Sequence, residues 1–145
     1  MPLAQQLSLL EDPMVLAELA PDPGADYGEV FTRRGVVELI LDLAGYTANR
    51  DLGRQVLVEP SSGIGAFLVP VVERLIESAS SHGRDISSLG PSIRAFDLLE
   101  ANAQRARKAV AQLLVEHGID GDEAEAMAGE WVTTSDFLLY PHEST

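Results

Sequence analysis

A strand that ends in an acid and is followed by a turn with two glycines is the best candidate for a binding site in this chain. Residues 56–68 read VLVEPSSGIGAFL, where the acid is Glu59 and the glycines are Gly63 and Gly65. Glycines let a ligand approach the backbone, and the first turn of the following helix offers N–H groups without partners. This order predicts a pocket for a nucleotide-like ligand, although the glycines alone would favour an ordinary strand-to-helix turn.

Two further acids follow predicted strands and narrow the choice of ligand. Asp97 ends the second strand and suits a ribose, because a carboxylate accepts hydrogen bonds from two adjacent hydroxyls; it also suits a helix cap before Leu99. Asp136 follows the third strand. A dinucleotide is disfavoured, because Leu68 replaces a close-approach glycine and Glu59 would repel a diphosphate. A ligand with a ribose, an adenine and a cationic or zwitterionic tail fits better, and S-adenosylmethionine is such a molecule.

The elements that must position these acids alternate between strand and helix. Strands are expected over residues 55–59, 92–97 and 131–135, and helices over 28–45, from 66 onward, over 99–117 and over 120–128. Thr32 is a predicted N-cap, and Gly45 and Gly118 are predicted to end their helices. Right-handed crossovers place the second strand beside the first and the third outside it, so the strand ends share one edge. The predicted fold class is α/β, a partial Rossmann-like three-layer sandwich with about three parallel strands, preceded by an N-terminal helical segment.

Composition excludes several classes of function. The chain of 145 residues has a formal net charge of −13 and a single lysine, so it is not expected to grip a nucleic-acid backbone by itself. The absence of cysteine excludes disulfides and thiolate metal sites, and the three histidines lack metal spacing, so no metal is expected. No apolar run is long enough to cross a membrane and no leader is evident, so a soluble, cytoplasmic protein is expected.

Four motifs in this order resemble the amino-terminal half of S-adenosylmethionine-dependent DNA adenine-N6 methyltransferases. They are Gly28–Thr32 with the helix after it, Glu59–Leu68, Ile93–Asp97 and Asp136–Leu139. The most similar class is the restriction–modification type, in which the cofactor motifs precede the catalytic one. The resemblance covers residues 27–139 and implies the class I methyltransferase fold.

The resemblance implies a role for each matched residue on the methionine side of the cofactor. Phe31 and Thr32 match the segment that closes over the methionine end. Glu59 corresponds to the acid that faces the methionine amine. Gly63 and Gly65 form the turn that passes beneath the cofactor.

The adenosine side is assigned in the same way. Asp97 corresponds to the ribose ligand, while Asp136 and Phe137 match the pair that bonds the adenine amino group and packs on its ring. Pro60, Phe67 and Leu98 are the remaining residues expected at the cofactor. The chain departs from the family pattern at Arg33, where relatives often have proline, and at Ser62, where they often have cysteine.

The turn that performs the chemistry in this family does not occur in the sequence. Such methylases flip the target adenine out of the duplex and hold its amino group with an Asn-Pro-Pro-aromatic turn, which is absent here. Residues 28–145 are therefore expected to be the cofactor-binding half of a domain truncated before that motif, and residues 1–27 an N-terminal helical arm. Because positioning the nucleophile is most of what such an enzyme contributes, no catalytic residue is assigned and the isolated chain is expected to be inactive.

Partners and alternatives follow from the same absence. Contact with DNA is expected only through missing C-terminal regions or a partner chain, with no membrane involved. One alternative is a non-catalytic binding subunit or remnant that pairs with a partner polypeptide through its open sheet edge. A nicotinamide-dependent Rossmann module is a further alternative, disfavoured by Leu68 and Glu59.

Overall fold

The computed structural model describes residues 27–60, 62–63 and 65–139, with side chains described from Arg34 onward. Its helices are α3 (Tyr27–Ala44), α4 (Leu68–Ser81), α5 (Glu100–Glu116) and α6 (Gly121–Trp131). Its strands are β1 (Leu57–Glu59), β2 (Ile93–Asp97) and β3 (Val132–Thr134), joined by short 3-10 turns η2 (Leu52–Arg54), η3 (Ile86–Ser88) and η4 (Gly90–Ser92). The expected helical arm lies outside the described residues apart from Tyr27.

The three strands form one parallel sheet in the order β1-β2-β3, as predicted. The register places Leu57 opposite Ile93 and Ala95 opposite Val132. Strand β1 begins at Leu57 and not at Gln55, because the Gln55 N–H closes the preceding 3-10 turn on the Leu52 carbonyl at 3.0 Å. The α/β architecture with parallel strands is confirmed.

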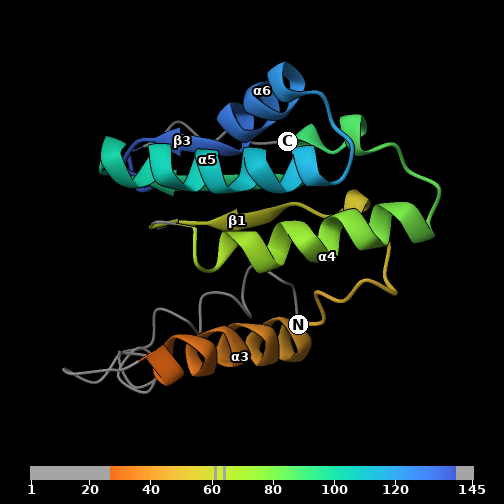
Figure 1. The fold of residues 1–145 in the computed structure, drawn as a ribbon, viewed down its shortest axis with the longest axis horizontal. Helices are drawn as coiled ribbons and strands as arrows, with labels where there is room; N and C mark the ends of the chain where they lie inside the picture. Colours follow the sequence, from red (N-terminus) through yellow and green to blue (C-terminus); the bar gives the residue numbers. More distant parts are fainter. Residues whose placement is uncertain (1–26, 61, 64, 140–145) are drawn as a thin grey trace.

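The helices bury apolar faces against the sheet and against each other. Helix α4 contributes Val71, Val72 and Leu75, which are completely buried. Pro70 is tolerated because it is the third residue of α4, where a missing N–H leaves no helical bond unmade. Helices α4 and α5 contact each other, so both crossovers lie on one face of the sheet. In Figure 1 the helices run roughly parallel in the order α5, α4, α3, with β1 seen between α5 and α4.

Two predicted helix boundaries were wrong. Helix α3 starts at Tyr27, so Thr32 is inside it and is not its N-cap; no proline interrupts residues 27–32, and the helix continues through them. Helix α6 continues to Trp131, which was expected in the third strand. Trp131 is completely buried, and its indole nitrogen lies 3.1 Å from the carbonyl oxygens of Leu89 and Gly90. These contacts place the last residue of α6 in the core.

Glycines end the long helices where the sequence predicted. Gly45 after α3 has φ +76° and Gly118 after α5 has φ +89°, a conformation that glycine adopts without a steric penalty. The Tyr46 N–H then bonds the Leu41 carbonyl at 2.9 Å and turns the chain back toward the core. Within the described residues, no helix combines the length and apolar character needed to span a membrane.

An arginine on α4 fixes α3 in place. Arg74 donates to the side chains of Glu38 at 2.5 Å and Asp42 at 2.7 Å, and to the Tyr46 carbonyl at 3.0 Å. Only 15% of the Arg74 side chain is exposed, so these bonds are shielded from water more than a surface pair. Hydrogen bonds and ion pairs of Arg74 therefore contribute to the contact between α3 and α4.

Candidate functional site

The predicted acids lie at the carboxyl edge of the sheet. Glu59 ends β1 and Asp97 ends β2, while Asp136 follows β3 by two residues. The Ser135 N–H donates to the Asp97 backbone carbonyl at 2.9 Å, which ties the end of β3 to the end of β2. Because parallel strands share one carboxyl edge, these residues belong to the side of the sheet where open α/β folds bind ligands.

Asp97 is the organising carboxylate of this edge. It is 5% exposed, and one oxygen accepts the Gly63 N–H at 2.8 Å while the other accepts the Leu99 N–H at 2.9 Å. Leu99 is the N-cap residue of α5, so Asp97 does not bond the second or third helical N–H as an N-cap side chain does. Each oxygen retains a lone pair, so the carboxylate can still accept hydroxyl donors.

The glycine turn is held against the end of β2. Gly63 and Gly65 have φ of +54° and +93°, and the Ser62 N–H donates to the Phe96 carbonyl at 2.7 Å. A Cβ at Gly65 would lie 3.4 Å from the Ala106 backbone of α5, whereas a Cβ at Gly63 would meet nothing within 4 Å. Gly65 therefore permits close packing on α5, and the space beside Gly63 is open for a ligand to approach the backbone.

Ser62 is a residue whose importance the sequence did not indicate. Its side chain is 4% exposed, and its hydroxyl has no hydrogen-bond partner. An unpaired buried hydroxyl costs about 1–3 kcal/mol. The loop that contains Ser62 has this cost, whereas the buried Asp97 carboxylate at the end of β2 accepts two hydrogen bonds. The only signal in the sequence was that relatives often carry cysteine at this position. A thiol is a weaker hydrogen-bond donor than a hydroxyl and loses less when it is buried without a partner.

The start of α4 lacks a side-chain cap. Its N-cap residue is Phe67, whose side chain makes no capping hydrogen bond, and Phe67 itself is half-buried against the core. The first-turn amides of an uncapped helix carry positive partial charge and suit anionic or strongly polar groups. This end faces the glycine turn because Val69 donates its N–H to the Gly65 carbonyl at 2.9 Å.

At the end of β3 an aromatic pair continues the edge. The ring of Phe137 packs edge-on against Phe96, with 5.3 Å between ring centroids. Asp136 accepts the Leu138 N–H at 2.9 Å and so shapes the turn that carries Phe137. Phe137 is thus brought to Phe96, the residue directly before Asp97.

A charged contact beside this edge is structural. Glu100, in the first turn of α5, accepts hydrogen bonds from the Thr134 hydroxyl and from Arg107, the latter at 3.0 Å. The Thr134 bond, followed by the Arg107 bond, lowers the pKa of Glu100. Arg107 also donates to the Val132 carbonyl at 3.0 Å, so the group ties α5 to β3.

Comparison with known proteins identifies relatives. The chain is 42% identical over 118 residues to the type II methyltransferase M.XhoI of Xanthomonas vasicola, which covers 79% of this chain and 22% of that protein. It is 41% identical over 119 residues to M.PaeR7I of Pseudomonas aeruginosa and 34% identical over 123 residues to M.BstVI of Geobacillus stearothermophilus. The chain is related to one part of type II methyltransferases. It spans only 21–22% of the length of these relatives. No protein-family model and no solved structure matches it.

The methyltransferase relationship confirms the resemblance stated from the sequence, and the α/β fold agrees with it. Of the predicted cofactor residues, the structure brings Asp97 and Gly63 into direct contact and places Phe137 beside Phe96. Glu59, the last residue of β1, and Pro60 directly after it are half-buried, and Leu98 is 69% exposed. The side chains of Phe31 and Thr32 lie outside those described, and these two assignments stay predictions.

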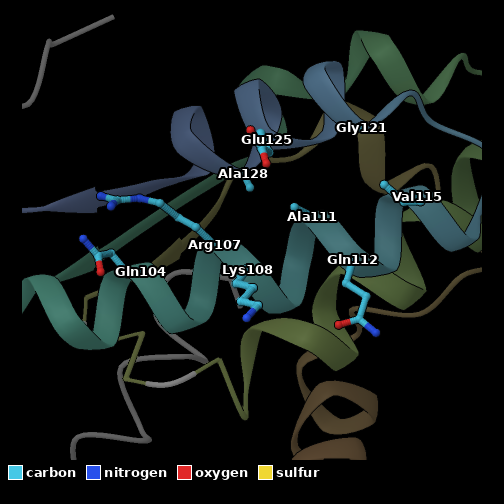
Figure 2. Close-up of a pocket in the computed structure, with 9 residues that line it drawn as sticks. All are labelled: Gln104, Arg107, Lys108, Ala111, Gln112, Val115, Gly121, Glu125 and Ala128. Atoms are coloured by element: carbon cyan, nitrogen blue, oxygen red, sulfur yellow. The ribbon is translucent and has the colours of Figure 1, made fainter.

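The described part of the chain also has a groove away from the predicted cofactor residues. This groove of about 540 Å³ is lined by residues of α5 and α6 (Figure 2). Its lining is Gln104, Arg107, Lys108, Ala111, Gln112, Val115, Gly121, Glu125 and Ala128. None of these residues belongs to the predicted site, so the groove is separate from the carboxyl edge. In the described part of the chain, no group of three or more His, Cys, Asp or Glu side chains is arranged to hold a metal ion.

Proposed function

We propose that this chain is the S-adenosylmethionine-binding portion of a DNA adenine-N6 methyltransferase. The observation that carries the proposal is the contact between the nearly buried Asp97 carboxylate and the Gly63 N–H at 2.8 Å, at the carboxyl edge of a parallel sheet. The relationship to type II methyltransferases supports the transfer of a methyl group. Adenine as the target base rests on the order of the four sequence motifs.

The residues of the edge fit this cofactor. Asp97 retains acceptor capacity for the two ribose hydroxyls, and the open side of Gly63 leaves room above the backbone. Glu59 supplies negative charge for the methionine ammonium. Among the described residues no arginine binds Asp97, so the negative charge of Asp97 is not neutralised by an ion pair. Phe137 supplies an aromatic surface for the adenine ring, with Asp136 as the acceptor for its amino group.

When bound, the cofactor supplies the sulfonium methyl group that an adenine amino group attacks directly. The residues of this chain then bind and orient it: the carboxylates hold its hydroxyl and amine groups, and the glycine turn lets it lie against the backbone. We assign the orientation of the adenine to polypeptide that carries an Asn-Pro-Pro-aromatic turn, since that turn does not occur in the sequence of 145 residues. The chain by itself is thus proposed to bind cofactor without transferring the methyl group.

The net charge of −13 assigns DNA contact to other polypeptide as well. A second candidate, a non-catalytic binding subunit that pairs with a partner chain through its sheet edge, is favoured by the single pairing partner of β1 among the described strands. The two candidates share the same cofactor edge and differ in whether methyl transfer occurs in the assembled complex.

Calorimetric titration tests the proposal. We expect S-adenosylhomocysteine to bind the wild-type chain with one site and NAD to give no heat of binding. Asp97→Asn, which removes the charge and one acceptor, is expected to weaken binding by at least about tenfold, since each charge-assisted bond contributes about 1.5–3 kcal/mol. Asp51→Asn, a carboxylate at the other end of the sheet, is the matched control and is expected to leave affinity unchanged. Binding of NAD, or equal affinity in both variants, would refute the assignment.

A further inference from the structure

Helices α5 and α6 carry opposite charge although they lie side by side. Helix α5 contains three cations and two acids, whereas α6 contains four acids and no cation. The two helices pack against each other. Among the described residues no ion pair joins them, and Arg107 pairs instead with Glu100 of its own helix. Charges of both signs therefore remain on this face for another molecule.

The groove between these helices has a side of each sign. Lys108 lies on the α5 side and Glu125 on the α6 side; both are exposed, and neither forms an ion pair with a described residue. Figure 2 shows them on opposite sides of the groove, near the same point along its length. The rest of the lining includes small or apolar residues, namely Ala111, Ala128 and the 49% exposed Val115. A molecule that fits has an acid opposite Lys108 and a base opposite Glu125.

The chain itself presents this pattern. In a dimer with two-fold symmetry the same surface of both copies forms the interface, and each contact occurs twice. A two-fold axis that runs along the groove lays α5 of each copy over α6 of the other. Because Lys108 and Glu125 lie near the same point along the groove, this arrangement brings Lys108 of each copy to Glu125 of the other. The small side chains of Ala111 and Ala128 leave room for the facing helices to approach.

We propose that the groove between α5 and α6 is the interface of a homodimer of this chain. We call the set Lys108, Ala111, Val115, Glu125 and Ala128 the α5–α6 face. The length and diameter of the two helices give this face about 400 Å² per copy, which is at the small end for specific interfaces, so the dimer is weak and reversible. None of these residues belongs to the predicted cofactor site, and the proposal does not depend on the proposed function.

The net charge of −13 on each copy does not prevent this association. At physiological ionic strength the Debye length is about 8 Å, so charges that are farther apart are largely screened. Charges in contact across the α5–α6 face are closer than this distance, and their signs are opposite. The local pairs therefore outweigh the repulsion between the distant acids.

Two other occupants fit less well. The phosphate backbone of a nucleic acid would be repelled by the four acids of α6. Residues 1–26 of the chain itself contain five acids and no lysine or arginine, so they offer no basic side chain to Glu125. A second copy supplies both signs at the positions where they are needed.

Sedimentation velocity of the full 145-residue chain in about 150 mM salt tests the α5–α6 face. We expect a reversible monomer–dimer equilibrium with half-association at about 10–100 µM. Lys108→Glu and Glu125→Lys are each expected to weaken the dimer at least about tenfold, because the symmetry turns two attractive pairs into two like-charge pairs. The combined variant Lys108→Glu/Glu125→Lys restores opposite charges and is expected to return to within about threefold of the wild type.

Arg94→Glu and Glu77→Lys are the matched controls. Both residues are exposed and lie elsewhere, on β2 and α4, and each substitution changes the net charge as much as its counterpart on the face. Repulsion set by net charge alone would make Glu125→Lys associate more strongly, whereas the α5–α6 face requires both single variants to associate more weakly. All four substituted side chains are exposed, so the thermal midpoint should stay at that of the wild type.

Three results would overturn the proposal. The first is a chain that stays monomeric at concentrations about tenfold above the expected range. The second is an equal effect of the test and control substitutions. The third is a combined variant that associates no better than the single variants.

Nuclear magnetic resonance spectra distinguish the other occupants. Dilution of the wild type is expected to shift the amides of residues 104–115 and 121–128 and to leave the Gly63 amide unchanged. A spin label on Ser8→Cys, unique because the chain has no cysteine, would broaden the same amides in the monomer if residues 1–26 covered them. A short DNA duplex would shift them in the wild type and not in Lys108→Glu if the face bound nucleic acid. Either of the last two results would also overturn the proposal.

Discussion

The two ends of the small parallel sheet satisfy their polar groups in different ways. At the amino end Arg84 makes a two-bond contact with Asp51 at 2.5 and 2.7 Å. Ser78 donates to the Arg50 carbonyl and accepts the Leu52 N–H at 3.0 Å. Together with the indole of Trp131, these paired groups form the closed end of the sheet, although the buried Tyr46 hydroxyl in the loop after α3 has no partner among the described residues.

The carboxyl end is open by comparison. Among the described residues, Asp97 accepts from the neutral N–H groups of Gly63 and Leu99 and the Ser62 hydroxyl has no partner, while Leu98 and Leu138 are 69% and 85% exposed. Both ends contain a carboxylate and a buried serine, so composition does not separate them. The difference teaches that the partners of a polar group, more than its type or burial, distinguish a structural end of the sheet from an end suited to a ligand.

The largest effect should come from removing the aromatic residue of the closed end. Trp131→Ala is expected to lower the free energy of unfolding by about 3–5 kcal/mol, because a completely buried side chain with a bonded N–H is lost. Urea unfolding followed by circular dichroism measures it. A loss below about 1 kcal/mol would mean that the closed end is not part of the stable core.

The two buried serines provide a direct contrast between the ends. Ser78→Ala is expected to destabilise by about 1–3 kcal/mol, because the buried Leu52 N–H loses its acceptor. Ser62→Ala removes a hydroxyl without a partner and is expected to raise stability by about 1 kcal/mol. Urea midpoints of the two variants should therefore shift in opposite directions. Equal losses would show that both hydroxyls are satisfied in solution.

The two glycines of the turn should separate stability from binding. Gly65→Ala is expected to cost about 2 kcal/mol, since φ of +93° is a conformation that side chains disfavour, while its Cβ would make an ordinary van der Waals contact with Ala106. Gly63→Ala is expected to cost only about 1 kcal/mol, because φ of +54° is left-handed helical and the space is open. It should nevertheless weaken S-adenosylhomocysteine binding, measured by calorimetry, because the new methyl group enters that space. Unchanged affinity in Gly63→Ala would place the ligand elsewhere.

The smallest effect is the pH dependence that Asp51 gives to the closed end. Hydrogen bonds from Arg84 hold the pKa of Asp51 below its ordinary value. Asp51 therefore contributes stability that is present above the ordinary aspartate pKa of about 3.9 and is lost as pH falls through the lowered value. Urea midpoints between about pH 5 and pH 3 should fall more in the wild type than in Asp51→Asn. Parallel curves would mean that the contact does not persist in solution.

The sequence predicted the topology well because its signals are local. An unbroken apolar run marked the middle of β1, an acid marked the end of β2, and glycine marked the ends of α3 and α5. The boundary at Trp131 was wrong because an aromatic residue suits a strand or a buried helix end, and only the tertiary contact with the Leu89 and Gly90 carbonyls decides. The predicted N-cap at Thr32 was wrong because threonine is acceptable both as a cap and inside a helix.

The sequence predicted which residues belong to the candidate site, but not which of them contact each other. The position of Asp97 at the end of β2 could be predicted, but its bond to the Gly63 N–H depends on how the turn folds back over the sheet. The unpaired hydroxyl of Ser62 could not be predicted either, because satisfaction of a buried group depends on its neighbours in space. The exposure of Leu39 and Leu43 on α3 could not be predicted from the apolar stripe, because it depends on which elements pack against the helix.

Chemical-shift mapping of the 145-residue chain with S-adenosylhomocysteine tests the contrast between the two ends most directly. The account predicts large, saturable shifts at the amides of Gly63, Gly65 and Leu99, and none at the Trp131 indole or the Asp51 amide. Shifts concentrated at Trp131 and Asp51, or in the groove between α5 and α6, would contradict it.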